Sequence, residues 1–380
     1  MGWGGGANAV LRLLVIGLLG RLLTPTEFGV VGAALVVIAF SETFANLGLG
    51  PAVIQRQNLE PRHIRTAYTL SFVLGFLIGL LLYLLAPAAE ALFRVDGVAS
   101  VLRVLAWVFP VRGLGAVAGA LLRRNLEFRW LANMSILTYL IGYAVIGVAA
   151  ALSGWGVWAL VAGTLGETTL KTAAMLYKRP PLRGRLLDIS AMGDLARFGT
   201  GSALGRLPQY VATQVDNLIV GRWLGAEALG IYGRAYQLVA LPAQLLSMAI
   251  GQPLLSSMSL VQDQRERLLL ALRRAISGIA LLTLPAAAVM CVLAGDIVEV
   301  VLGDQWTDAV LPLRVLAVAM LFRVGEGLSD SMYKAMGAVF RGAWRAWLFA
   351  VLVITAAAIG RQWGLVGVAA GVSISYAINY

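Results

Sequence analysis

Charged and amide side chains interrupt the apolar stretches of this chain at helical spacing. Between residues 195 and 222, the polar positions Arg206, Gln209, Thr213 and Asp216 follow one another every three or four residues. This spacing places them on one face of a helix. A charge at the centre of a bilayer costs about 2.5–3.5 kcal/mol on insertion scales, so such groups normally face a hydrated cavity or each other. The pattern predicts either a polar cavity or hydrogen bonding between helices.

Two other apolar stretches carry polar groups of the same kind. Residues 229–256 contain Arg234 and Gln237, and residues 28–50 contain Glu42 one turn before Asn46. Arginine binds phosphate through two parallel hydrogen bonds, so a partly cationic cavity would suit an anionic head group or a pyrophosphate. The alternative is again a structural seam between helices. The cavity candidates from these three stretches are Glu42, Arg206, Asp216, Arg234 and Gln237.

A fourth stretch, residues 311–334, places four charged residues on one helical face. They are Arg323, Glu326, Asp330 and Lys334, at spacings of three, four and four. Such spacing predicts either a ladder of salt bridges or a relay for protons or cations. Glu167 and Lys171, four residues apart, are interpreted as a structural pair.

The composition places these residues in a membrane protein. Of 380 residues, 59% are hydrophobic and 13% are charged, whereas soluble domains have about 25% charged residues. The net charge of +11 is spread over short loops, unlike the clustered basic surface that nucleic-acid binding requires. One cysteine and one histidine leave no disulfide and no structural zinc or other metal site. The sequence also lacks a GxxxxGK[ST] phosphate loop and a GxSxG elbow, so we expect a transporter without a cofactor, not an enzyme.

The apolar stretches predict an all-α integral membrane protein with twelve spans of the length a bilayer requires. Fourteen Lys and Arg residues lie in or beside the loops after even-numbered spans and two in the loops after odd ones, so both termini are predicted to be cytoplasmic. Glycines such as Gly75, Gly79 and Gly142 are expected to let helices approach closely. The predicted spans are 7–23, 28–50, 67–86, 101–121, 131–152, 155–176, 195–222, 229–256, 271–293, 311–334, 344–360 and 363–380.

The chain also repeats itself. GRLLTPTEFGVVGAA at 20–34 aligns without gaps with GRWLGAEALGIYGRA at 221–235, at an offset of 201. LRVLA at 102–106 recurs at 313–317, an offset of 211 that pairs Arg112 with Arg323. This order predicts two tandem six-helix lobes, 1–176 and 195–380, joined by a basic cytoplasmic linker at 177–194 and related by an axis along the membrane normal. In transporters with such repeats the substrate path runs between the halves.

Several motifs resemble one known family. GRLLTPTEFGVVGAA, FANLGLGPAVIQRQNL (44–59), LLRRNLEFR (121–129) and DNLIVGRWLGAEALGIYGRAYQLVALP (216–242) are similar to the Wzx-like bacterial polysaccharide flippases of the multidrug, oligosaccharidyl-lipid and polysaccharide exporter superfamily. The resemblance implies alternating-access transfer of undecaprenyl-pyrophosphate-linked oligosaccharides across the bacterial inner membrane for surface polysaccharide biosynthesis. It also implies cavity arginines for the pyrophosphate and a proton or sodium gradient as the driving force. Arg21 and Arg222 occupy matching positions of the repeated motif.

Other functions stay open at this point. A multidrug or metabolite antiporter would share the fold, although drug exporters of this kind favour acidic cavities. A membrane polymerase or ligase of the same pathway is the other alternative. The expected partners are the lipid-linked oligosaccharide, membrane lipids, a polysaccharide polymerase and the chain-length machinery, with no nucleic acid. Relatives often carry two further helices, so the chain is either a twelve-span member or a truncated fourteen-span one.

Overall fold

The computed structural model describes residues 2–45, 49–181, 187–188, 190–193, 207–259, 265–326 and 339–379. Every regular element within these ranges is helical, which confirms the all-α prediction. The described residues form two compact units, one of residues 30–210 and one of residues 2–29 together with 211–380. The division into six-helix lobes at 1–176 and 195–380 stays a prediction.

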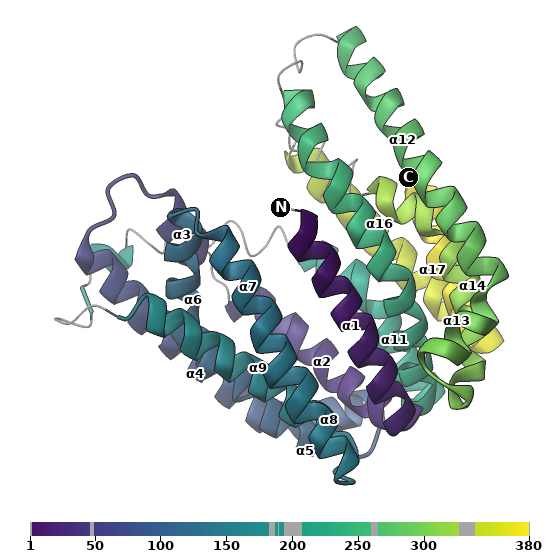
Figure 1. Ribbon diagram of the computed structural model, residues 1–380, viewed down its shortest axis with the longest axis horizontal. Helices are drawn as coiled ribbons and strands as arrows, with labels where there is room; N and C mark the ends of the chain where they lie inside the picture. The colour runs from purple at the N-terminus through teal and green to yellow at the C-terminus, as the bar shows by residue number, and fades with distance from the viewer. Residues whose placement is uncertain are drawn as a thin grey trace. The chain divides into compact units, whose positions relative to one another are not determined.

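The N-terminal unit contains most of α2 and the helices up to α9 (Figure 1). α5 and α6 are separate helices that break at Ala106 and Trp107, where the sequence predicts one continuous span. The helices are α2 (Pro25–Ala45), α3 (Leu49–Gln55), α4 (Pro61–Phe93), α5 (Val98–Leu105), α6 (Val108–Arg124), α7 (Phe128–Thr138), the π-helix η1 (Tyr139–Val145), α8 (Ile146–Leu152) and α9 (Val157–Lys178).

The C-terminal unit contains α1 and the helices from α11 onward. α11 changes direction at Gly225, whose φ of 93° interrupts the helical backbone. The helices are α1 (Gly2–Leu22), α11 (Leu207–Ser259), α12 (Arg265–Val292), α13 (Ala294–Val301), the 3-10 helix η2 (Asp304–Ala309), α14 (Val310–Val318), α16 (Val339–Gly360), the 3-10 helix η3 (Arg361–Trp363) and α17 (Gly364–Asn379).

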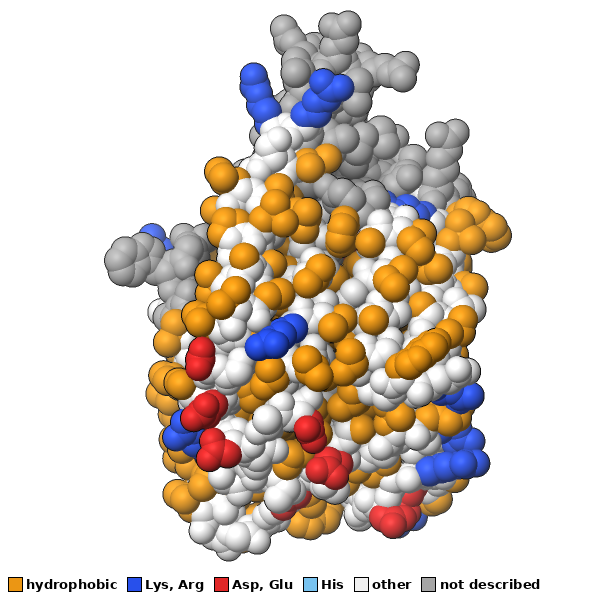
Figure 2. Space-filling view, turned by 90° about the vertical axis from the view of Figure 1, so that its right-hand side faces the viewer, with side chains coloured by type: hydrophobic (Ala, Val, Ile, Leu, Met, Phe, Trp, Pro, Cys, Tyr) orange, Lys and Arg blue, Asp and Glu red, His pale blue; other side chains and the backbone are white. Residues whose placement is uncertain are grey.

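Apolar side chains on the outer faces of these helices match a lipid environment. Within the described ranges, five helical segments are long and apolar enough to cross a membrane, and a sixth is a pair bent by 75° at α12 and α13. The outward-facing Leu84 of α4 and Leu281 of α12 are 65% and 75% exposed. Figure 2, which faces the C-terminal unit, shows a broad hydrophobic band with acidic side chains gathered toward one end. The chain is therefore a multi-pass membrane protein, while the number twelve stays a prediction.

Glycines hold the helices of the N-terminal unit at short distances. A Cβ atom at Gly75 would lie 2.5 Å from the carbonyl oxygen of Phe109, and one at Gly142 would lie 2.4 Å from the backbone nitrogen of Glu167. The close approach of helices expected at these glycines is confirmed, and the partners are α4 with α6 and η1 with α9. The π-helix was not predicted, because an apolar π-turn has no distinguishing sequence pattern.

The two copies of the repeated motif meet within the C-terminal unit. A Cβ atom at Gly29 would lie 1.7 Å from the carbonyl oxygen of Ala226, and one at Gly230 would lie 1.9 Å from that of Pro25. These four residues are equivalent in pairs under the offset of 201. The contact is therefore reciprocal, as a local twofold relation between two copies of one motif requires.

Candidate functional site

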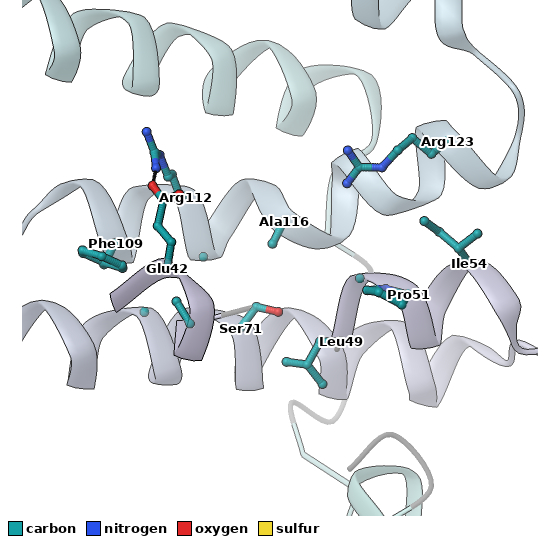
Figure 3. A pocket seen from close by; sticks show the side chains of 13 residues that line it. Glu42, Leu49, Pro51, Ile54, Ser71, Phe109, Arg112, Ala116 and Arg123 are labelled. Atoms are coloured by element: carbon teal, nitrogen blue, oxygen red, sulfur yellow. Dashed lines mark ion pairs between the residues drawn. The ribbon is translucent and has the colours of Figure 1, made fainter. Parts of the chain in front are cut away.

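A polar cavity of about 480 Å³ opens in the N-terminal unit. Its walls come from the end of α2, from α3, from the middle of α4 and from nearly the whole length of α6 (Figure 3). The side chains that line it include Glu42, Ala45, Leu49, Pro51, Ile54, Ser71, Phe109, Arg112, Ala116 and Arg123.

Glu42 of α2 and Arg112 of α6 form an ion pair inside this cavity. Figure 3 shows the two side chains facing each other across the space, with Arg123 farther along α6. The side chains of Arg112 and Glu42 are 47% and 36% exposed, so the pair is half-buried. The structure thus places Glu42, a predicted cavity residue, beside a cation that the sequence indicates only as the repeat partner of Arg323.

A second polar cavity, of about 280 Å³, lies between α6 and α9. Arg112, Ala116 and Arg123 line both cavities. On the α9 side the lining adds three threonines and two charged residues, namely Thr164, Glu167, Thr168, Lys171 and Thr172. Glu167 and Lys171 therefore face a cavity, in addition to the structural role that their spacing indicates.

Small residues on α6 make this arrangement possible. Arg112, Ala116, Gly119 and Arg123 follow at spacings of four, three and four, so they share one helical face. At 1.5 Å per residue the two arginines project about 16 Å apart along the axis. The small side chain of Ala116 lies between the two arginines, and the absence of a side chain at Gly119 leaves room for Met175 and for the guanidinium of Arg123, whose Nη2 atom would lie 3.6 Å from a Cβ atom there.

The described charged residues that line the two cavities are three cations and two carboxylates. Arg112, Arg123 and Lys171 are the cations, and Glu42 and Glu167 are the carboxylates. Guanidinium groups donate paired hydrogen bonds to phosphate oxygens, and an ammonium group adds a point charge. This lining is therefore suited to a ligand with more than one negative charge.

The predicted residue Asp216 occupies a different place, in a buried polar cluster of the C-terminal unit. Asp216 is 1% exposed, and its Oδ2 atom accepts a hydrogen bond of 2.8 Å from the hydroxyl of Tyr232. The guanidinium of Arg323 lies 4.1 Å from the ring centre of Tyr236 and 5.2 Å from that of Tyr376. Helices α11 and α17 and the segment after α14 thus meet at a cluster in which tyrosine rings lie beside both Asp216 and Arg323.

The remaining arginines predicted for the cavity contact aromatic rings or backbone carbonyls. Arg234 stacks over Phe28 at 4.5 Å, and Arg222 lies 5.6 Å from the ring of Trp223. Arg21 donates a hydrogen bond of 2.8 Å to the carbonyl of Val300, which ties the end of α1 to α13.

The other predicted residues lie apart from the two cavities or beyond the described ranges. Gln237 and Glu326 are partly buried in the C-terminal unit. The predicted Arg206, Asp330 and Lys334 lie outside the residues that the structure describes. Of the predicted cavity residues that the structure describes, Glu42 lines one of the two cavities, and the arginines of α6 were not among the predicted residues.

An ion-pair cluster joins the start of α7 to the end of α9 outside the apolar segments. Glu127 accepts a hydrogen bond from Arg179, and Lys178 Nζ lies 3.7 Å from the same carboxylate. The hydrogen bond from Arg179 is the largest effect that lowers the pKa of Glu127 below its usual value. The hydroxyl of Tyr68 donates a hydrogen bond of 2.7 Å to the carbonyl of Arg179, so α4 is tied to the same point.

Comparison with known proteins places the chain in a family. The sequence model of the family described as "Polysaccharide biosynthesis protein" matches residues 18–311. The chain belongs to this family. This membership confirms the resemblance that the motifs indicate.

The relatives have names from the synthesis of surface polysaccharides. The chain is 26% identical to an uncharacterized membrane protein in the cps region of Klebsiella pneumoniae, over 97% of this chain and 77% of that protein. It is 25% identical to the lipopolysaccharide biosynthesis protein WzxC of Escherichia coli, over 98% of this chain and 77% of WzxC. It is 24% identical to the teichuronic acid biosynthesis protein TuaB of Bacillus subtilis, over 86% of this chain and 68% of TuaB.

Solved structures of transporters share the fold. The lipid II flippase MurJ, in an inward closed conformation, superposes with a TM-score of 0.81 at 14% identity, over 98% of this chain and 84% of MurJ. An inward-facing multidrug resistance transporter of the MATE family gives 0.76 at 19% identity, over 98% and 92% of the two chains. At these identities the likeness shows the fold alone.

Proposed function

We propose that this protein is a flippase that transfers undecaprenyl-pyrophosphate-linked oligosaccharide repeat units across the bacterial inner membrane by alternating access. The observation that carries the proposal is the cationic lining of Arg112, Arg123 and Lys171 in a multi-pass membrane protein of the polysaccharide biosynthesis family. Charged groups within membrane helices are costly and mark substrate pathways.

The charge of the cargo supports this assignment over other polar ligands. A pyrophosphate diester carries two negative charges. The lining of the two cavities has three cations and two carboxylates, so its formal charge is positive by one. When Arg112 leaves Glu42, its guanidinium can bind phosphate oxygens in pairs. The same positive lining disfavours the cationic substrates of a multidrug antiporter.

Energy coupling to a proton or sodium gradient belongs to the same proposal. The sequence has no phosphate loop for nucleotide hydrolysis. Glu42 in the cavity and the buried Asp216 are the carboxylates through which we expect an ion to act. Further parts of the proposal are cytoplasmic termini and association with a polysaccharide polymerase and the chain-length machinery.

The proposal is tested by measuring transfer of the lipid-linked repeat unit in a deletion strain. The strain carries either no copy of the protein or one variant at a time. Arg112→Ala is expected to lower export of the repeat unit by tenfold or more while membrane levels of the protein stay normal. Arg103→Ala is the matched control, because Arg103 is also on an apolar segment of this unit but lies over the ring of Tyr83 at 5.7 Å and does not belong to the lining of either cavity. Normal surface polysaccharide in the deletion strain, or altered drug susceptibility without a polysaccharide defect, would contradict the proposal.

A further inference from the structure

Two adjacent arginines at the end of α6 point to different surroundings. Arg123 lines both polar cavities. Arg124 instead reaches α3, where its Nη1 atom donates hydrogen bonds to the carbonyls of Val53 at 3.0 Å, Ile54 at 2.9 Å and Arg56 at 2.6 Å. Its Nη2 atom donates to the carbonyl of Gln57 at 3.3 Å.

These bonds complete the C-terminal end of a very short helix. α3 has seven residues, and the last four carbonyls of any helix lack partners within the helix. Helices of this length are marginal by themselves. The planar guanidinium has five donors in a fixed geometry, and its charge also complements the negative end of the helix dipole. Arg124 thus supplies stabilisation that α3 cannot provide from its own backbone.

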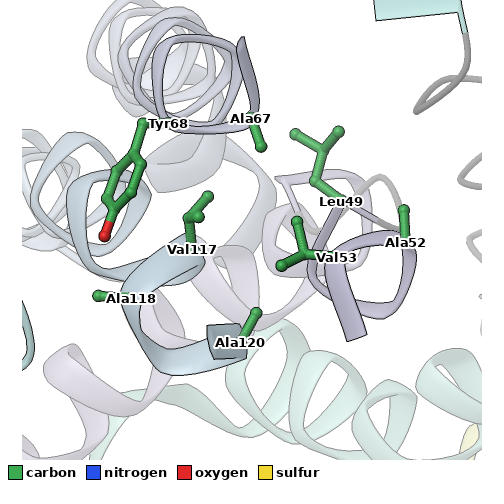
Figure 4. Close-up of a cluster of buried hydrophobic side chains, with 8 residues drawn as sticks. All are labelled: Leu49, Ala52, Val53, Ala67, Tyr68, Val117, Ala118 and Ala120. Atoms are coloured by element: carbon green, nitrogen blue, oxygen red, sulfur yellow. The ribbon is translucent and has the colours of Figure 1, made fainter. Parts of the chain in front are cut away.

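The apolar contacts of α3 leave this role to Arg124. Leu49, Ala52 and Val53 pack in a cluster with Val117, Ala118 and Ala120 of α6 and with Ala67 and Tyr68 of α4 (Figure 4). Half of these eight side chains are alanines, and larger, partly buried side chains such as Ile54, Leu74 and Leu121 pack around them. Apolar burial is non-directional, so these contacts hold α3 against α6 without specifying its position along α6. The polar anchor therefore sets where α3 lies along α6.

The position of α3 matters because its other side is a wall of the cavity. Leu49, Pro51 and Ile54 line the space opposite Arg123 (Figure 3). A shift of α3 changes the width of the cavity at this end and leaves the Glu42–Arg112 pair on α2 and α6 in place.

We propose that Arg124 is a positioning residue that holds α3 as the wall of the cavity and thereby sets the space in which Arg123 meets a ligand. The consequence for cargo rests on the proposed function, whereas the position of α3 does not. Arg124 does not belong to the described lining of either cavity, so it acts on the cavity through α3.

The test uses thiol labelling in purified protein without any cargo. Cys291 is the sole cysteine of the chain, so a Cys291→Ala background accepts one reporter at a time. Ile54→Cys reports on α3, and Ser71→Cys reports on the α4 wall of the same cavity. Arg124→Ala is expected to raise the maleimide reaction rate at position 54 by fivefold or more and to change the rate at position 71 by less than twofold. Arg129→Ala, at an exposed position on α7, is the matched control and should change neither rate.

Replacement of Arg124 by lysine distinguishes a positioning role from a general loosening of the fold. Arg124→Lys keeps a charge and fewer donors, so it should restore most of the protection at position 54. Arg124→Ala should weaken the apparent affinity for lipid-linked cargo more than it lowers the maximal rate of transfer, and Arg124→Lys should recover most of that affinity. Where Arg124→Ala gives no folded protein, Arg124→Gln replaces it in the same assay. Unchanged labelling at position 54, or equal increases at positions 54 and 71, would overturn the inference. If the labelling result is as expected but the protein transfers another cargo, the proposed function is overturned and the inference stands.

Discussion

At the scale of single residues, Glu42 competes with a ligand for Arg112, because the two side chains form an ion pair. An ion pair that is half-exposed contributes only about 0.2–1 kcal/mol, so a phosphate can displace the carboxylate at modest cost. Glu42→Gln keeps the shape of the side chain and removes this competitor. We expect the apparent affinity for lipid-linked cargo to rise by about 1.4- to fivefold, which is that energy range expressed as an equilibrium constant.

Kinetics in reconstituted vesicles would check this prediction. Tighter binding should come with a lower maximal rate, because the carboxylate no longer helps to release the phosphate. Arg112→Gln is the matched comparison, because it removes the cation and should weaken binding. A loss of affinity in Glu42→Gln would show that the carboxylate binds cargo directly.

The ion-pair cluster of Glu127 leads to a prediction about pH. Its pKa is lowered from the usual 4.5, mainly by the hydrogen bond from Arg179. A carboxyl group whose pKa is lower in the folded state stabilises the fold above its unfolded pKa, and this contribution is lost as pH falls through the folded pKa. The thermal midpoint of the wild type should therefore exceed that of Glu127→Gln at neutral pH and approach it below pH 4.5. A constant difference across this range, measured in detergent, would contradict the assignment.

At the scale of elements, the reciprocal contact between α2 and α11 has the two shortest clearances among the described glycines. A Cβ atom at Gly29 or Gly230 would lie within 2 Å of a carbonyl oxygen of the other helix. Overpacking costs about 1–3 kcal/mol even where neighbours can move, and here both clashes are with backbone. Gly29→Ala and Gly230→Ala are therefore each expected to lower the thermal midpoint strongly or to abolish folded protein in size-exclusion profiles.

A third glycine on the same helix provides the control. A Cβ atom at Gly233 would meet no other atom within 4 Å, so Gly233→Ala should be neutral or stabilising by up to about 1 kcal/mol through helix propensity. Equal destabilisation by all three substitutions would mean that these helices need glycine for their backbone conformation and not for the contact between α2 and α11.

The elements also show how far a sequence of this kind can be interpreted. The apolar stretches, the close glycine contacts and the motif repeat at 20–34 and 221–235 were predictable, because each depends on spacing along one helix. The break between α5 and α6 and the π-helix were not, since apolar residues continue through both. Glu42 was found as a charge in an apolar stretch, whereas Arg112 and Arg123 were not assigned to the cavity. Their placement depends on which face of α6 packs against α4 and α9, and spacing within one helix does not determine that choice.

At the scale of the whole molecule, the distribution of positive charge predicts which loops face the cytoplasm. Asp96 precedes α5 and Asn125 follows α6, so the apolar segment Val98–Arg124 separates them. Arg123, Arg124 and Arg129 surround Asn125, and the positive-inside rule places that end in the cytoplasm.

In the Cys291→Ala background, Asp96→Cys should react with an impermeant maleimide in intact cells. Asn125→Cys should react only after the membrane is permeabilised. Both positions are exposed, so a difference between them reports the side of the membrane and not burial. Labelling of both from outside would place the α5–α6 segment within the membrane without crossing it, and the opposite pattern would invert the predicted orientation of the N-terminal unit.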